Sequence, residues 1–353
     1  MERKRRILVA PLDWGLGHAT RCIPIINALL KRNAEVIIAA SGSSAELLKV
    51  EFPNIKHCSL PAYNPSYPAN SNMVWAMARQ LPHFVKTIYN EHATLNKLIE
   101  KEQIEVVISD NRYGCYSHKV KSILIYHQLH ILMDEGYKWM EGYVNHFNNR
   151  QIKHFDECWI PAPNNELLGN LLPPKLPAHT RFIGYQSRFN KQPAEIKYHI
   201  VAIASGPDPQ RTLLTNMLRN QLIESGLRTF LVHGLVSEEE KISVTGNFTE
   251  ANYLTSDKLN NIIQQGNIII ARSGYSTIMD MAKLGKKAIF IPTPGQTEQA
   301  YLAAQLMNKG ISLCVEQSAF NLKNALKESD KFSGFTNFEY HETLLGQAIQ
   351  SIL

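Results

Sequence analysis

Two stretches of the sequence place a residue that could move a proton directly after an apolar run. LDWGLGHATR, residues 12–21, follows ILVAP and carries Gly15, Gly17 and His18 at the start of a predicted helix. The run VVIS is followed by Asp110. Histidine titrates near neutral pH, and both imidazole and carboxylate can take a proton from a hydroxyl group. His18 and Asp110 are therefore rival candidates for a general base. The alternative is that His18 only orders its loop.

The glycines of the first stretch do not fit a nucleotide-binding turn. A dinucleotide fingerprint G-x-G-x-x-G needs a third glycine where this chain has Thr20. It also needs an acidic residue after the second strand, where Ser41-Gly42 stands instead. No Gly-Lys-Ser/Thr follows, which excludes a Walker loop. We therefore expect a nucleotide to bind elsewhere in the chain.

NIIIARSGYSTIMD, residues 267–280, is typical of an anion site at the start of a helix. A buried strand is predicted to end at Ala271, Ser273 is a good N-cap, and Gly274 allows a ligand close to the backbone. The free N–H groups and the dipole of the helix then attract a phosphate. Asp280 could reach a sugar hydroxyl beyond it, or could be a solvated surface acid. Gly285 is predicted to end the helix.

Apolar runs that alternate with amphipathic stretches must position these residues. Runs without polar alternation are typical of parallel strands covered on both faces. The sequence predicts an α/β fold of two tandem Rossmann-like, doubly wound domains, residues 1–185 and 186–335, with a cleft between them and a C-terminal helix in 336–353. Six of the 17 prolines lie between Pro161 and Pro193, which indicates a linker or an irregular edge. The expected strands are Ile7–Ala10, Glu35–Ala40, Ile104–Ser109, Ile123–Tyr126, Tyr198–Ala204, Thr229–His233, Ile268–Ala271 and Ala288–Pro292.

The composition fits a globular protein with sizeable cores. Of 353 residues, 44% are hydrophobic and 19% charged, and the net charge of +6 suits phosphates or an anionic membrane without requiring nucleic acid. No apolar stretch approaches a membrane span or a signal-peptide core. The five cysteines are scattered, which favours free thiols in a reducing compartment. We expect a cytoplasmic protein.

Residues 267–310 resemble the donor-binding region of the GT-B glycosyltransferases of family 28, the group of MurG and the plant galactolipid synthases. The resemblance implies that the helix start receives a nucleotide diphosphate. Asp280, where MurG-type enzymes usually have Glu, would hold the ribose, and Glu298 and Gln299 would hold the sugar. The matching residues are Arg272, Ser273, Gly274, Thr277, Asp280, Gly285, Glu298 and Gln299.

Shorter stretches resemble the same family more loosely. Arg188 stands where an arginine approaches the diphosphate, Ser205 and Gly206 stand in place of a glycine-rich phosphate loop, and Leu254 stands near the base-reading segment. The resemblance places Gly15, Gly17 and His18 at the acceptor, and YHQLH after another predicted strand borders the same region through His127, Gln128 and His130. The histidine pair has metal-ligand spacing but no further ligand. The resemblance implies neither metal nor cofactor.

Two stretches, residues 73–86 and 137–153, mix large apolar and basic side chains. Membrane-associated relatives dock through such a patch. The alternative is that the apolar side chains belong to the core and the basic ones are solvated at the surface.

We therefore expect an inverting, metal-independent transferase that moves a sugar from a UDP-sugar, for example UDP-N-acetylglucosamine, to a hydroxyl acceptor, with lipid-linked acceptors among the candidates. An anionic surface on the inner face of the membrane is the candidate docking partner. The alternatives are a UDP-sugar epimerase of the same fold and a non-catalytic nucleotide-sugar-binding partner protein. The sequence specifies neither the sugar nor the acceptor.

Overall fold

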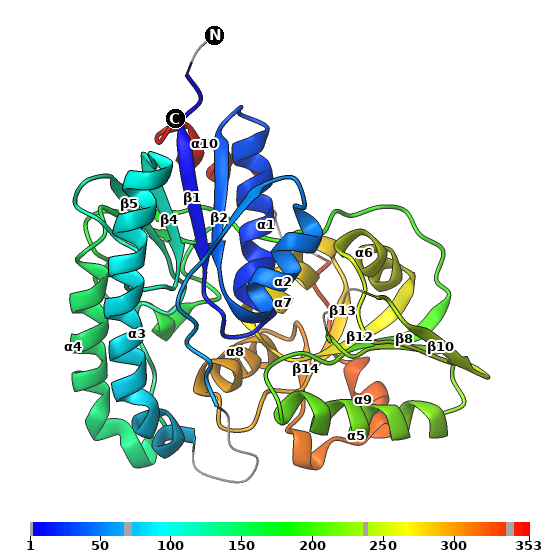
Figure 1. Ribbon diagram of the computed structural model, residues 1–353. Coiled ribbons are helices and arrows are strands. Elements are labelled where there is room, and N and C mark those ends of the chain that lie inside the picture. The colour runs from blue at the N-terminus through cyan, green and yellow to red at the C-terminus, as the bar shows by residue number, and fades with distance from the viewer. Residues whose placement is uncertain (1–2, 67–72, 236–238, 337–341) are drawn as a thin grey trace. The chain divides into compact units, whose positions relative to one another are not determined.

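The computed structural model describes residues 3–66, 73–235, 239–336 and 342–353 (Figure 1). The chain divides into two compact units. Unit 1 comprises Met1–Pro65, Met77–Gln186 and Tyr340–Leu353, and unit 2 comprises Ser66–Ala76 and Ser187–Glu339. Each unit has its own seven-stranded sheet.

The sheet of unit 1 is parallel throughout, with the strand order β3-β2-β1-β4-β5-β6-β7. The order reverses between β1 and β4, and ligands of open α/β sheets bind outside the carboxyl ends of strands at such a point. Leu8, Ile37 and Val107 form a buried core with Leu95 and Ile99 of the long helix α3. The strands are β1 (Arg6–Pro11), β2 (Glu35–Ala40), β3 (Lys56–Ser59), β4 (Val106–Asp110), β5 (Lys121–Ile125), β6 (Glu157–Ile160) and β7 (Thr180–Phe182); the helices are α1 (Leu16–Leu30), α2 (Gly42–Glu51), α3 (Met73–Glu102), η1 (Glu135–Met140), α4 (Glu141–Ile152), η2 (Gly169–Leu171) and α10 (Glu342–Gln350).

The sheet of unit 2 has the order β10-β11-β9-β8-β12-β13-β14 and reverses between β8 and β12. Its strands are parallel except for the antiparallel hairpin β10–β11. The strands are β8 (Tyr198–Ile203), β9 (Thr229–Val232), β10 (Ile242–Thr245), β11 (Phe248–Ala251), β12 (Gly266–Ala271), β13 (Lys287–Phe290) and β14 (Leu313–Cys314); the helices are α5 (Gln210–Glu224), α6 (Ser256–Gln265), α7 (Tyr275–Leu284), α8 (Thr297–Asn308), η3 (Gln317–Ala319) and α9 (Leu322–Ser329).

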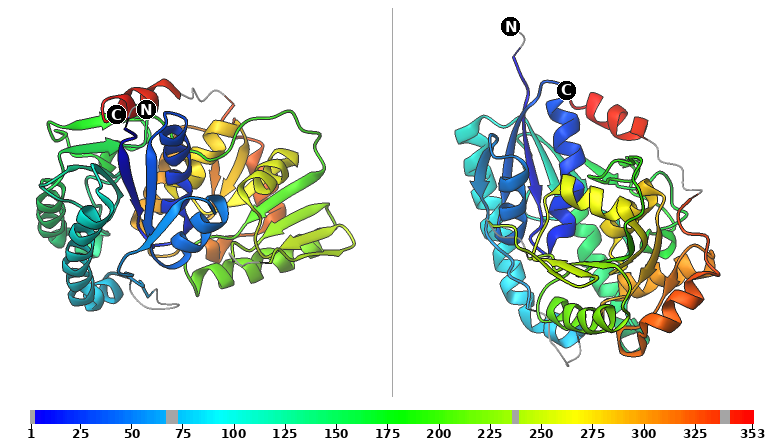
Figure 2. Two further views of the ribbon diagram at one scale, coloured as in Figure 1. Left: turned by 45° about the horizontal axis from the view of Figure 1, so that its top comes forward. Right: turned by 90° about the vertical axis from the view of Figure 1, so that its right-hand side faces the viewer.

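The C-terminal helix α10 packs against α1 in unit 1, as Figure 2 shows. Ala348, Ile349 and Ile352 are buried there, and Arg5 donates a hydrogen bond from Nη1 to the carbonyl oxygen of Ile352 at 2.7 Å. Within the described part of the chain, none of the helices has the length and apolarity needed to cross a membrane.

Candidate functional site

His18 and Asp110 meet at the carboxyl edge of the unit 1 sheet. β1 and β4 are neighbours, with Pro11 opposite Asp110, so the loop after β1 reaches the end of β4. Gly15 precedes α1 with a φ of 86°, a left-handed conformation that favours glycine. The His18 Nδ1 atom lies 2.7 Å from Asp110 Oδ1. The His18 side chain is 14% exposed, whereas that of Asp110 is fully buried.

Arg21, which the sequence analysis missed, connects this pair to a second histidine. Its side chain is 2% exposed, and its Nε and Nη2 atoms donate to the two carboxylate oxygens of Asp110. Its Nη2 atom also lies 2.8 Å from His18 Nδ1, and its Nη1 atom lies 2.9 Å from Nδ1 of buried His127. The structure thus gathers three predicted site residues, His18, Asp110 and His127, around one guanidinium.

The neighbouring charges keep Asp110 ionised, and burial together with the Arg21 charge keeps His18 neutral. Burial alone would raise the pKa of Asp110, but the charge and hydrogen bonds of Arg21, together with His18, outweigh burial and hold that pKa well below its usual range. Burial and then the Arg21 charge lower the pKa of His18, against the opposite effect of Asp110. Cys22 Sγ lies 3.6 Å from Asp110 Oδ2. Burial and the Asp110 charge raise the pKa of Cys22, so it stays a thiol.

The remaining predicted residues of unit 1 lie around this cluster without joining it. Gly17 accepts a hydrogen bond from Thr20 Oγ1 at 3.0 Å, which closes the first turn of α1. Gln128 is partly buried. His130 pairs instead with Glu141 of α4, at 3.1 Å between Nε2 and Oε1. Among the described residues no group of three His, Cys, Asp or Glu side chains is placed to hold a metal ion.

A second buried arginine, for which the sequence analysis predicted no role, connects the loops at this edge. Arg112 donates from Nε to the Pro11 carbonyl at 2.7 Å and from Nη1 to the Pro61 carbonyl at 3.1 Å. Its counter-ion is Glu91 of α3, with 2.5 Å between Nη1 and Oε1. A Ser41 hydroxyl accepts from Nη2. The loops after β1, β2 and β3 are thereby fixed to one side chain.

In unit 2, α7 starts without a side-chain cap. The N-cap is Gly274 and not Ser273 as predicted, and no side chain caps the helix. The Ser273 hydroxyl donates instead to the Gln299 carbonyl at 2.9 Å, which ties α7 to α8. A Cβ atom on Gly274 would meet nothing within 4 Å. Partly buried Thr277 lies in the first turn, and Gly285 ends α7 in the left-handed conformation, as predicted.

Asp280, on the second turn of α7, lies among basic side chains. Ser187 Oγ donates to Asp280 Oδ1 at 2.5 Å. Burial raises the pKa of Asp280 to about 6, against the opposing charges of Arg188 and Lys283. The Arg188 guanidinium lies 4.9 Å above the Phe189 ring and donates to Ser256 Oγ at 2.9 Å. The structure therefore brings the predicted pair Arg188 and Asp280 into one neighbourhood.

The loop after β8 lies at the same edge as the start of α7, because Ile203 is opposite Ala271 in neighbouring strands. Ser205 and Gly206 are partly buried in this loop, and Gly206 has a φ of 100°. Leu254 lies in the loop that connects β11 to α6, and its side chain is buried.

Arg272 and Gln299, both predicted to bind the donor, have partners within unit 2. The buried guanidinium of Arg272 donates to the carbonyls of Ile291, Pro292 and Gln210 at 3.0–3.2 Å. The Gln299 side chain accepts from the Thr293 N–H at 2.9 Å and donates to Gln296 Oε1 at 2.5 Å. Both residues shape the loops at this edge. Glu298 beside them is partly buried in the first turn of α8.

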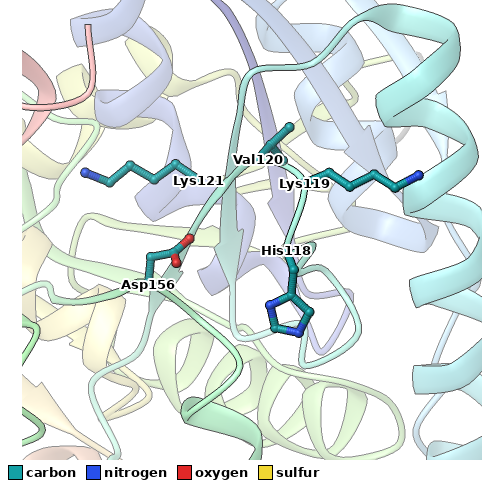
Figure 3. A pocket seen from close by; sticks show the side chains of 5 residues that line it. All are labelled: His118, Lys119, Val120, Lys121 and Asp156. Carbon is teal, nitrogen blue, oxygen red and sulfur yellow. The ribbon is translucent and has the colours of Figure 1, made fainter.

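An open pocket of about 480 Å³ lies at the opposite edge of the unit 1 sheet, around the start of β5 (Figure 3). Lys119 and Lys121 extend in opposite directions there and pair with Glu100 and Glu157, at 2.6 and 2.7 Å. These paired charges lie away from the His18 cluster. The lining residues are His118, Lys119, Val120, Lys121 and Asp156.

Comparisons with known proteins agree with this arrangement. Residues 220–343 match the glycosyltransferase family 28 C-terminal domain. An uncharacterized glycosyltransferase of Methanosarcina acetivorans is 23% identical over 330 residues, which cover 86% of this chain and 84% of that protein. A UDP-N-acetylglucosamine--N-acetylmuramyl-(pentapeptide) pyrophosphoryl-undecaprenol N-acetylglucosamine transferase of Histophilus somni is 29% identical over 185 residues, or 48% of this chain and 49% of that protein. The structure of spinosyn rhamnosyltransferase SpnG complexed with thymidine diphosphate shares the fold, with a TM-score of 0.60, 16% identity, and coverage of 98% of this chain and 96% of that chain.

Proposed function

Because the chain is a glycosyltransferase of the GT-B fold and the family 28 type, we propose that it transfers a sugar from a UDP-sugar to a hydroxyl acceptor with inversion at the anomeric carbon. The observation that carries the proposal is the polar edge of each sheet. Unit 1 presents the His18–Asp110 pair, and unit 2 presents the uncapped start of α7 with Asp280. UDP-N-acetylglucosamine is the first donor to test, since the Histophilus somni relative is named for it.

The donor would lie along the carboxyl edge of the unit 2 sheet. The positive end of the α7 dipole would attract the diphosphate, and no side chain covers the start of this helix as a cap. Gly274 leaves open space at that position. Asp280 would accept hydrogen bonds from the ribose, and Arg188 beside it would offset the phosphate charge. A donor site of this kind needs no side-chain cap on α7, in agreement with the glycine found there.

His18 is the better of the two candidate bases. Asp110 is buried, engaged by Arg21 and held at a low pKa, so it is a weak base. His18 is partly exposed and has a lowered pKa, so its imidazole is neutral at pH 7. His18 Nδ1 lies near both Arg21 Nη2 and Asp110 Oδ1, and Nη2 already donates to that oxygen. When Nδ1–H also donates to Asp110 Oδ1, the lone pair of Nε2 can take a proton.

The proposed step is a single displacement. The acceptor oxygen forms a bond to the anomeric carbon, its proton passes to His18 Nε2, and the bond from that carbon to the diphosphate oxygen breaks. UDP leaves with the bonding pair, and attack opposite the leaving group inverts the configuration. We propose that the α7 N-terminus and Arg188 stabilise the departing charge without a metal.

A lipid-linked acceptor and a membrane surface are part of the proposal because unit 1 exposes large aromatic side chains. Trp139 is 71% exposed and Tyr143 is 78% exposed, and Lys138 and Arg150 supply positive charge nearby in sequence. Leu81 and Tyr89 are exposed on α3, which runs beside α4 in Figure 1. Trp139→Ala/Tyr143→Ala should abolish flotation with anionic vesicles without changing the melting temperature. Unchanged flotation would remove the membrane from the proposal.

A screen of sugar nucleotides with the purified protein tests the function itself. We expect UDP-sugars to bind and NAD not to bind, and transfer to a hydroxyl acceptor to require His18. His18→Ala should lower kcat by about 10²–10⁴ with donor KM within about twofold, while the control His57→Ala in the same unit should keep kcat. Product formed from UDP-N-acetylglucosamine alone would indicate an epimerase. Donor binding without turnover in the unsubstituted protein would indicate a binding partner.

A further inference from the structure

We propose that Arg21 is a positioning residue for this reaction, a buried cation that holds the His18–Asp110 pair in the state that can accept a proton. The inference rests on the proposed function only in taking His18 as the base. It concerns a side chain that is buried and does not itself reach a substrate.

The hydrogen-bonding capacity of a guanidinium fixes the states of its neighbours. A guanidinium has five N–H donors and no acceptor, and it stays charged. Asp110 receives two of these donors on its two oxygens and must therefore be ionised. His127 Nδ1 faces Nη1 at 2.9 Å, so this nitrogen must accept, and the His127 proton sits on Nε2. One side chain thus determines the charge of Asp110 and the tautomer of His127.

Arg21 also sets how strongly Asp110 acts on His18. A lone carboxylate 2.7 Å from an imidazole would favour the imidazolium ion. Here Arg21 shares the carboxylate and lies 2.8 Å from the same imidazole nitrogen, which opposes that ion. The charged and titratable groups that face His18 are Arg21 on α1, Asp110 at the end of β4 and His127 after β5. Burial disfavours the imidazolium ion, and the two full charges offset each other, so His18 keeps an uncharged imidazole oriented by Asp110.

The first test is the pH dependence of kcat in Arg21→Gln. Without the guanidinium, Asp110 acts on His18 unopposed, so the acidic limb of the profile should move up by about one pH unit or more. At a pH below the midpoints of both acidic limbs, the rate relative to that at pH 9 should fall about tenfold. Donor KM should stay within about twofold. Arg21→Lys should keep most of the limb position because it keeps the charge, and Arg32→Gln, which removes an exposed charge from the turn just after α1, should leave the limb unchanged.

A direct titration of His18 separates this inference from the proposed function. NMR of ¹³C-labelled histidine, assigned with His18→Gln, reads the pKa whether or not the protein transfers a sugar. We expect the His18 pKa to rise in Arg21→Gln. If the single variant does not fold, the double variant Arg21→Gln/Asp110→Asn can be used in its place, because it removes both charges and leaves a neutral buried pair. Its His18 pKa should stay close to that of the unsubstituted protein.

Two results would overturn the inference. One is an unmoved acidic limb and an unmoved His18 pKa in folded Arg21→Gln. The other is a His18 pKa that is lower in the double variant than in the unsubstituted protein, because Arg21 would then fail to offset the effect of Asp110 on His18 in the unsubstituted protein. A protein that shows the expected pKa changes but no dependence of turnover on His18 would refute the proposed base and leave the Arg21 effect in place.

Discussion

Asp280 carries a cost in stability that its binding role would explain. Burial raises its pKa to about 6, whereas the carboxyl group titrates near 4 in an unfolded chain. Between these pH values the folded state binds more protons, so stability falls as pH rises through this window. Asp280→Asn should therefore raise the melting temperature at pH 7.5 by about 2–4 °C and weaken UDP-sugar binding at least tenfold.

The pH dependence of both effects checks the cause. The gain in melting temperature should disappear below pH 4, where the carboxyl group is protonated in both states. Donor affinity of the unsubstituted protein should fall as pH drops through about 6, because a protonated Asp280 loses its charge-assisted hydrogen bonds. Scanning calorimetry and titration calorimetry at pH 4, 6 and 7.5 measure the two quantities. A thermal gain that persists at pH 4 would contradict this account.

Two arginines of unit 2 should respond in opposite ways to substitution. Arg272 is buried, and Arg272→Gln would leave carbonyls of Ile291, Pro292 and Gln210 without their donor. We expect this to cost about 2–4 kcal/mol of unfolding free energy. Arg188→Gln removes a charge that offsets the burial of Asp280, so it should cost less, about 1 kcal/mol, and weaken UDP binding about tenfold, as urea denaturation and calorimetry would show. Equal losses of unfolding free energy in the two variants would contradict this distinction between a structural and a ligand-binding arginine.

Arg21 shows why single-sequence reasoning located the candidate site only in part. His18 and Asp110 could be predicted because each follows a buried apolar run, and the ends of parallel strands gather at one edge. Their separation of 2.7 Å depends on β1 lying beside β4, which the local sequence does not specify. The same holds for Arg21, whose position in a helix gives no sign that its guanidinium reaches the end of β4.

Gly274 at the start of α7 tests the donor site directly. Its φ of −66° suits any residue, and a Cβ there would meet nothing within 4 Å, so the fold does not require glycine. A ligand close to the backbone would require it. Gly274→Ala should keep the melting temperature within about 1 °C and weaken UDP binding about tenfold or more. Gly142→Ala in α4, where a Cβ also meets nothing, is the matched control. Unchanged UDP binding would exclude the close approach.

The elements differ in how far their sequences predicted them. β1, β2 and β12 were expected because their apolar runs are continuous, and they are buried centrally in the two sheets. The hairpin β10–β11 was missed, since all four residues of β10 are exposed and carry no core pattern. The long helix α3 was missed because Pro82 interrupts it and its buried positions are sparse. Its packing on the unit 1 sheet decides its structure.

The molecule divides its proposed tasks between two units with separate cores. The His18 cluster belongs wholly to unit 1, and the residues predicted for the donor belong wholly to unit 2. Substitutions at His18 or Arg21 should therefore change turnover with little effect on donor affinity. The helix α10 is the exception to a simple sequential division, because the chain returns to unit 1 after unit 2 is complete.

Because α10 packs in unit 1, the stability of unit 1 depends on this C-terminal helix. Ile349 is buried in α10, which packs against α1, and Ile349→Ala should cost about 2–4 kcal/mol of the stability of unit 1. Hydrogen exchange should then accelerate in α1, α10 and β1, with exchange in unit 2 and UDP affinity unchanged. Ile289→Ala, equally buried in β13, should reverse the pattern and accelerate exchange in unit 2 only. Faster exchange in both units for either variant would show one cooperative structure instead of two.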